Sequence, residues 1–98
     1  MLIRIHNSYR DVVSIVDKEL LGKKFEEGNF QLDIKESFYK GEEYDEENAL
    51  KIMINMALED STFNIVGEKS IKTSLKAGII TKDSIKRIQN IPYSLVLV

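Results

Sequence analysis

Short segments in which apolar and polar residues alternate predict the strands of this chain. Near the N-terminus, Ile3 and Ile5 fall on one face of such a segment, which is typical of a half-buried strand. The same alternation predicts that Phe30, Leu32 and Ile34 point inward. Strands are predicted over residues 2–6, 12–16, 30–34, 62–66 and 93–98, with the first two in an antiparallel hairpin and only turns over 17–29.

A largely apolar segment with a helical period predicts a long helix over residues 45–60. Asp45 is a suitable N-cap, because its carboxylate can accept hydrogen bonds from the first N–H groups of the helix. Intervals of three and four residues predict an inward stripe of Leu50, Met53, Ile54, Ala57 and Leu58. Three further apolar residues lie off this stripe, namely Ala49, Ile52 and Met56. A second element or a partner must therefore cover the flank of this helix.

The segment after Gly67 predicts a second helix over residues 68–77, which ends at Gly78. Its free N–H groups, together with Gly67, form a candidate backbone site for an anion at Gly67, Glu68 and Lys69. The chain has no glycine-rich phosphate motif here, and Glu68 would repel a phosphate. These features favour a plain strand-to-helix turn over an anion site.

The last part of the chain predicts a third, shorter helix followed by a strand. Thr81 is expected to start the helix, with Ile85 and Ile88 facing inward, and the helix ends before Pro92. The final residues of the 93–98 strand are all apolar. A bare apolar edge strand invites aggregation, so this strand lies between other strands, under a loop or at a subunit interface.

Composition and length restrict the class of protein. The 98 residues predict a single domain over 1–98, and 43% hydrophobic residues suffice for one core. The pattern predicts an α+β, two-layer sandwich, in which two to three helices pack mainly on one face of an antiparallel or mixed sheet. The chain has no cysteine, no apolar run of membrane-spanning length and no signal-peptide pattern, so we expect a cytoplasmic protein with no membrane partner.

The charges are distributed unevenly along the chain. Residues 1–60 carry 8 basic and 14 acidic side chains, whereas residues 61–98 carry six basic and two acidic ones. The basic residues recur at helical spacing and define a candidate lysine-rich face of Lys69, Lys72, Lys76, Lys82, Lys86 and Arg87. This face predicts a contact with RNA or a ribonucleoprotein, and an ordinary solvated surface is the alternative. Nothing in the sequence indicates sequence-specific binding to DNA.

The exposed apolar positions suggest a second function class. If the flank of the 45–60 helix and the C-terminal strand lack a cover, they form an interface with another protein or with a second copy of the chain. The candidate interface residues are Ile52, Met56, Leu95 and Leu97.

The sequence gives little support for an enzyme. No nucleophile motif is present, and the single histidine, His6, has no second histidine with which to form a two-histidine metal site. The acidic segment 41–47 lacks the order of a calcium loop, and its acids suit a helix start. We therefore predict no catalytic residues, no metal and no cofactor.

Several short motifs occur in a characteristic order. They are Leu21-Gly22 followed by Phe25 and Gly28, Phe38-Tyr39 followed by Gly41-Glu42, Asn64 followed by Val66-Gly67-Glu68, and then Gly78 and Pro92. In this order they make nearly the whole chain resemble a small archaeal family catalogued as domain of unknown function 424.

The resemblance implies a compact α+β protein of the archaeal cytoplasm, and it brings no established activity and no catalytic residues. A link between this family and RNA or the ribosome is a hypothesis. Family members often carry a histidine where this chain has Tyr93, so a histidine role at that position does not transfer to this protein.

Overall fold

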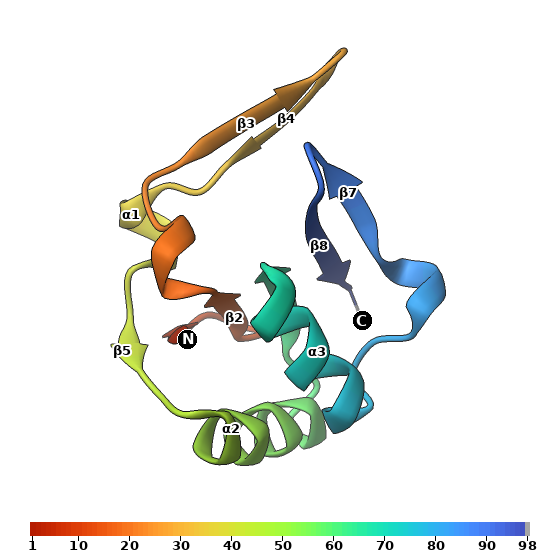
Figure 1. Cartoon of the computed structure of the whole chain (residues 1–98). Helices are drawn as coiled ribbons and strands as arrows, with labels where there is room; N and C mark the ends of the chain where they lie inside the picture. The colour runs from red at the N-terminus through yellow and green to blue at the C-terminus, as the bar shows by residue number, and fades with distance from the viewer. Residues whose placement is uncertain (98) are drawn as a thin grey trace.

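A mixed sheet of six strands forms the centre of the structure, which is a computed structural model that describes residues 1–97. The strand order is β5-β1-β2-β6-β8-β7 (Figure 1). Its strands are β1 (Leu2–His6), β2 (Val12–Val16), β5 (Glu42–Glu43), β6 (Thr62–Val66), β7 (Lys86–Ile88) and β8 (Ile91–Val96).

The pairing of the strands confirms a mixed sheet. β1 and β2 form the predicted antiparallel hairpin, in which Ile3 lies opposite Ile15. β2 and β6 run parallel, with Val13 opposite Phe63, and the long connection between them contains the first long helix. β8 pairs antiparallel with both β6 and β7. It therefore lies between other strands, which is the first of the three positions predicted for the C-terminal strand.

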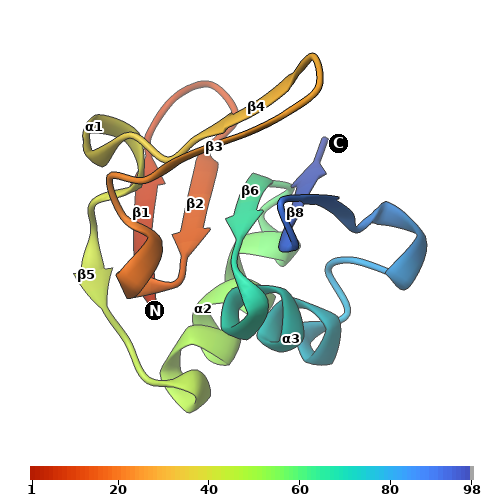
Figure 2. The same ribbon diagram turned by 45° about the horizontal axis from the view of Figure 1, so that its top comes forward.

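Helices cover one face of this sheet. α2 (Glu46–Leu58) and α3 (Glu68–Ala77) pack there on a core that includes Val13, Phe63 and Ile65. The opposite face is covered in part by α1 (Glu36–Tyr39) and by a separate hairpin of β3 (Lys24–Glu27) and β4 (Phe30–Asp33). Figures 1 and 2 show this hairpin on the far side of the sheet from α2 and α3.

The predicted helix over 45–60 is present, and its predicted inward stripe is correct at Met53 and Ala57 but wrong at Ile54 and Leu58. The Asp45 carboxylate accepts from the Asn48 N–H at 2.8 Å, as expected of an N-cap. Ala49 and Met53 are fully buried, whereas Leu58 is 79% exposed and Ile54 is 42% exposed. Apolar residues surround most of this helix, so the period alone did not fix which side meets the sheet.

Two strand residues predicted to face the core are exposed. Ile5 is 41% exposed near the outer end of β1, and Phe30 is 70% exposed close to the tip of the β3–β4 hairpin. The hairpin extends away from α2 and α3 (Figure 1), and Phe30 belongs to neither core cluster. The prediction of turns alone over 17–29 missed β3, because its Lys-Phe-Glu-Glu sequence is mostly charged. Backbone pairing with β4 forms this strand.

The predicted third helix is wrong. Thr81 is followed by a single 3₁₀ turn, η2 (Lys82–Ser84), and the chain then enters β7. Gln89 and Asn90 have φ of 47° and 68°, the positive values that a two-residue hairpin loop of type I′ requires. Pairing with β8 therefore overrides the helical period of this segment.

A second 3₁₀ turn, η1 (Lys18–Leu20), follows β2.

Candidate functional site

The joint between β6 and α3 depends on Gly67. Its φ of 109° and ψ of 156° lie in a region that side chains with a Cβ rarely adopt. A Cβ at this position would also lie 2.3 Å from the Cγ atom of Asp17. The Gly67 N–H donates to the carbonyl oxygen of Pro92 at 2.9 Å, which ties the joint to β8. The glycine therefore allows close approach of a carboxylate.

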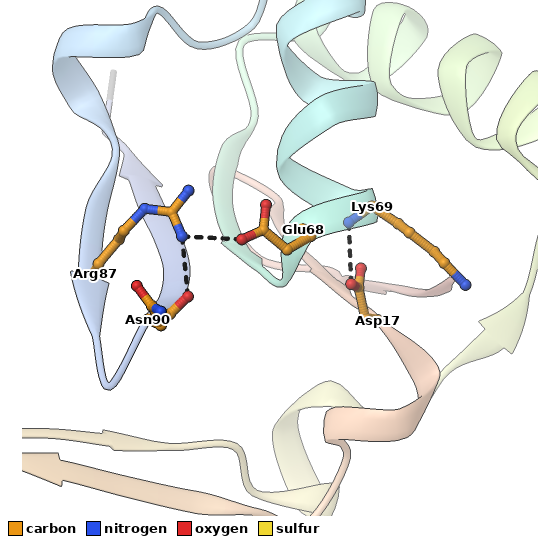
Figure 3. Close-up of polar contacts among 5 residues, drawn as sticks. All are labelled: Asp17, Glu68, Lys69, Arg87 and Asn90. Atoms are coloured by element: carbon orange, nitrogen blue, oxygen red, sulfur yellow. Dashed lines mark hydrogen bonds and ion pairs between the residues drawn. The ribbon is translucent and has the colours of Figure 1, made fainter.

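The Asp17 carboxylate occupies the start of α3 (Figure 3). Its Oδ2 accepts from the Lys69 N–H at 3.0 Å, and its Oδ1 accepts from the N–H and hydroxyl of Ser70 at 2.8 and 2.7 Å. Asp17 is buried. The candidate backbone anion site at Gly67, Glu68 and Lys69 is thus occupied by the chain's own carboxylate. An outside phosphate would have to displace it.

Lys76 lies on the side of α3 that faces α2. Its ammonium donates to a carboxylate oxygen of Glu46, in the first turn of α2. This hydrogen bond, and the charge of Lys76 with a smaller effect from Lys72, lower the pKa of Glu46 below its ordinary value of 4.5. Lys76 therefore connects α3 to α2 through this ion pair, and Glu46 offsets its positive charge.

Arg87 is also held in place. Its Nη1 donates to Glu68 Oε1 at 2.9 Å and to the Asn90 carbonyl oxygen at 2.9 Å (Figure 3). The first contact crosses from β7 to the first turn of α3, and the second closes the β7–β8 turn. The guanidinium group has a fixed position, and the side chain remains 49% exposed.

The remaining four cations of the lysine-rich face are Lys69, Lys72, Lys82 and Lys86. All four are exposed, and none forms an ion pair within residues 1–97. They lie on α3, η2 and β7. Figure 3 shows the Lys69 side chain directed away from Arg87. The predicted face therefore divides into two paired cations and four unpaired ones.

A groove of about 450 Å³ lies between α3 and the segment from η2 to β7. We call it the α3–β7 groove. Apolar side chains of Ile71, Leu75 and Ile85 line it, and Lys72, Lys82 and Arg87 add positive charge. Glu68 and Lys69 complete the lining. The sequence did not predict this groove, because one of its walls includes β7, where a helix was predicted.

A second cavity of about 410 Å³ lies between the start of α2 and α3. Its lining mixes both signs of charge, with Lys69 and Lys72 opposite acids of the segment 43–46. Close by, the Tyr44 hydroxyl donates to Glu42 at 2.9 Å, and this bond raises the pKa of Tyr44. Such a lining does not select an anion.

In the part of the chain that the structure describes, no three His, Asp or Glu side chains are placed to share a metal ion.

His6 has a structural environment. Its ring stacks on Phe38 with centroids 4.4 Å apart, and its Nε2 lies 3.0 Å from the Phe38 carbonyl oxygen. The Ser14 hydroxyl lies 3.4 Å from the same nitrogen and donates to the same carbonyl group. These contacts attach α1 to the sheet, and the Ser14 hydroxyl beside His6 is fully buried and donates to a backbone carbonyl.

The candidate interface residues lie in two different environments. Ile52 and Met56 are partly buried and pack against the core beneath α2. Leu95 is 57% exposed on β8, and Leu97 after it is 80% exposed. β7 pairs only with Ile91–Tyr93, so it does not cover the later part of β8. An interface at these residues stays a prediction, and Ile54 and Leu58 are the more exposed residues of α2.

Tyr93 lies on β8, where it is partly buried and packs against the second core cluster, the one beneath the β3–β4 hairpin. It pairs with Val66 on one side and Lys86 on the other. Its position is therefore within the sheet, beside the start of β7.

None of the helices within residues 1–97 is long and apolar enough to cross a membrane.

The comparisons with known proteins agree with this fold. A crystal structure of an uncharacterized conserved protein from Methanopyrus kandleri is 25% identical in sequence and superposes with a TM-score of 0.87. The match covers 97% of this chain and 88% of that one. The comparison with curated proteins finds no match. A family model described as "Protein of unknown function (DUF424)" matches residues 5–98. The predicted resemblance is confirmed: the chain belongs to the DUF424 family of proteins of unknown function.

Proposed function

We propose that the protein is a non-enzymatic binding module of the cytoplasm that contacts the phosphate backbone of RNA. The contact surface is the unpaired part of the lysine-rich face, consisting of Lys69, Lys72, Lys82 and Lys86. RNA within a ribonucleoprotein would offer the same phosphates. The single observation that carries the proposal is that these four exposed lysines form no ion pair within residues 1–97, although the charge of Lys72 helps to lower the pKa of Glu46.

The local field supports this proposal more than the net charge does. The whole chain has a net charge of −2, which does not favour RNA. Acidic side chains concentrate before residue 61, whereas the lining of the α3–β7 groove combines several cations with one carboxylate, Glu68, and Asp83 lies beside it in η2. Glu68 is already paired with Arg87. Association with a polyanion depends on the field at the contact, so an acidic protein can bind RNA through such a surface.

The salt dependence of binding tests the proposal. If all four unpaired lysines contact phosphates of a single strand, the logarithm of the association constant should fall against the logarithm of salt with a slope of about −3. The six cations predicted from the sequence would give about −4. The measurement is the fluorescence anisotropy of a labelled RNA at several salt concentrations. Binding that does not change with salt would contradict a phosphate contact.

A charge-reversal variant localises the contact. Replacing both Lys72→Glu and Lys82→Glu should lower RNA affinity about tenfold or more at low salt, because two attractions become repulsions. The matched control is Lys35→Glu with Lys51→Glu, which makes the same charge change at exposed residues outside the groove. Equal losses for the two double variants would assign the effect to net charge and would contradict a site at the groove.

A second candidate function rests on exposed apolar side chains. Leu58 is 79% exposed and Leu97 is 80% exposed, and such residues are the ones that an interface with a protein or a second copy would cover. Leu58→Glu and Leu97→Glu should then reduce self-association without unfolding the chain. Ile52 and Met56 are poorer test positions, since they pack on the core. Sedimentation of a wild type that is monomeric at all concentrations would exclude the homodimer.

A further inference from the structure

We infer that the α3–β7 groove binds an unpaired nucleotide of single-stranded RNA, with the base in the groove and its phosphates on Lys72 and Lys82. This inference rests on the proposed function and adds the kind of RNA. It starts from a feature that phosphate binding alone does not explain, which is the apolar lining between the two lysines.

The lining has the two chemistries that a nucleotide presents. Leu75 and Ile85 offer a partly exposed apolar surface beside the buried Ile71, and Lys72 and Lys82 come from the two opposite walls. A nucleotide has a flat, largely apolar base next to a charged phosphate. The groove volume of about 450 Å³ falls near the lower end of small-molecule sites, so it suits one base with its ribose rather than a run of bases.

Arg87 supplies a preformed platform beside this surface. Its guanidinium plane is held through Nη1 by Glu68 Oε1 and by the Asn90 carbonyl oxygen, each at 2.9 Å. Bases of single-stranded RNA stack on arginine planes as well as on aromatic rings. Because the two hydrogen bonds already fix the group, stacking on it costs little further loss of side-chain freedom.

A duplex cannot use the apolar part of the groove. In double-stranded RNA the bases are stacked and paired, and the deep, narrow major groove hides their edges from side chains. A duplex would therefore contact only the lysines. The geometry consequently favours a single strand over a duplex that carries the same number of phosphates.

The experiment compares three RNAs on the wild-type protein by fluorescence anisotropy. They are a single strand of about ten nucleotides, the same strand with abasic residues, and a duplex of matched phosphate number. We expect the intact single strand to bind about fivefold or more tightly than either of the others. The abasic strand keeps the charge and flexibility of the chain and lacks only the bases.

Two variants assign the preference to the groove. Arg87→Lys keeps the charge and loses the planar group, so it should remove most of the preference for the single strand and leave duplex affinity unchanged. Lys51→Gln, which lies outside the groove, should alter neither. Equal binding of the three RNAs by the wild type would overturn the inference and leave the proposed function standing. Absence of binding to any of them would overturn both.

Discussion

The start of α3 and the side of α3 that faces β7 both present positive groups, but only one of them is free. At the start, the N–H groups of Lys69 and Ser70 are bonded to the buried Asp17 carboxylate. Along the side, Lys72 and Lys82 are exposed and form no ion pair within residues 1–97. The N–H groups at a helix start therefore indicate an anion site only if no side chain of the same protein already accepts their hydrogen bonds.

The largest effect should come from removing the carboxylate at the start of α3. Asp17→Ala leaves buried donors of Ser70 and the Lys69 N–H without an acceptor, which should lower the free energy of unfolding by about 2–4 kcal/mol. Urea titration measures this loss. Asp45→Ala is the matched control, because Asp45 caps α2 at the exposed surface and should cost about 1 kcal/mol. If the two variants lose the same free energy of unfolding, Asp17 contributes no more than an ordinary exposed helix cap.

A Cβ at the joint should cost somewhat less. Gly67→Ala adds an atom 2.3 Å from Asp17 Cγ and strains a backbone with φ of 109°, so stability should fall by about 1–3 kcal/mol. Gly28→Ala is the control, since Gly28 also has positive φ, of 60°, but has nothing within 4 Å of an added Cβ. If both variants lose the same stability, backbone strain alone explains the Gly67 effect. The close fit to Asp17 would then be unsupported.

The Glu68–Arg87 pair should contribute little to stability. Both side chains are about half exposed or more, at 68% and 49%, and such pairs contribute roughly 0–1 kcal/mol. Glu68→Gln should therefore leave the thermal midpoint nearly unchanged. It should raise RNA affinity slightly, because it removes the one carboxylate of the groove lining while the amide oxygen of the glutamine can still accept from Arg87 Nη1. A large loss of stability in this variant would assign Arg87 a structural role instead.

The smallest effect is a pH dependence on the side of α3 that faces α2. Lys76 lowers the pKa of Glu46 below its ordinary value of 4.5, so the pair stabilises the folded state above that value. This contribution is lost as the pH falls through the lowered pKa. Lys76→Gln should therefore lose less stability than the wild type over this acid range. Stability curves that stay parallel in urea titrations would show that the pair contributes nothing.

Local patterns sufficed to predict most of the sheet and both long helices. Alternation over 2–6 and the largely apolar segment 12–16 predicted the first hairpin, and the second of these strands is buried on both faces. The Asp45 cap and the glycine at 78, whose φ is 75°, marked helix ends correctly because both act on their own helix. These features depend on neighbours within a few residues along the chain.

The features that define the candidate site depend on contacts between distant residues. The bond from Lys69 to Asp17 joins positions 52 apart in sequence, and no local pattern around Asp17 signals it. Ile85 and Ile88 have a spacing that also fits a helix, and only pairing with β8 makes residues 86–88 the strand β7. The α3–β7 groove follows from that choice. A sequence method therefore finds the lysines without finding the surface between them.

The most direct test of the central claim is a titration of the ¹⁵N-labelled protein with single-stranded RNA, followed by amide chemical shifts. We predict that amide signals along the groove, at Lys72, Leu75 and Ile85, move with increasing RNA, while that of the buried Ser70 keeps its position because Asp17 holds its N–H group. Large shifts confined to Lys69 and Ser70, with no change along the groove, would place the anion at the helix start and contradict the account.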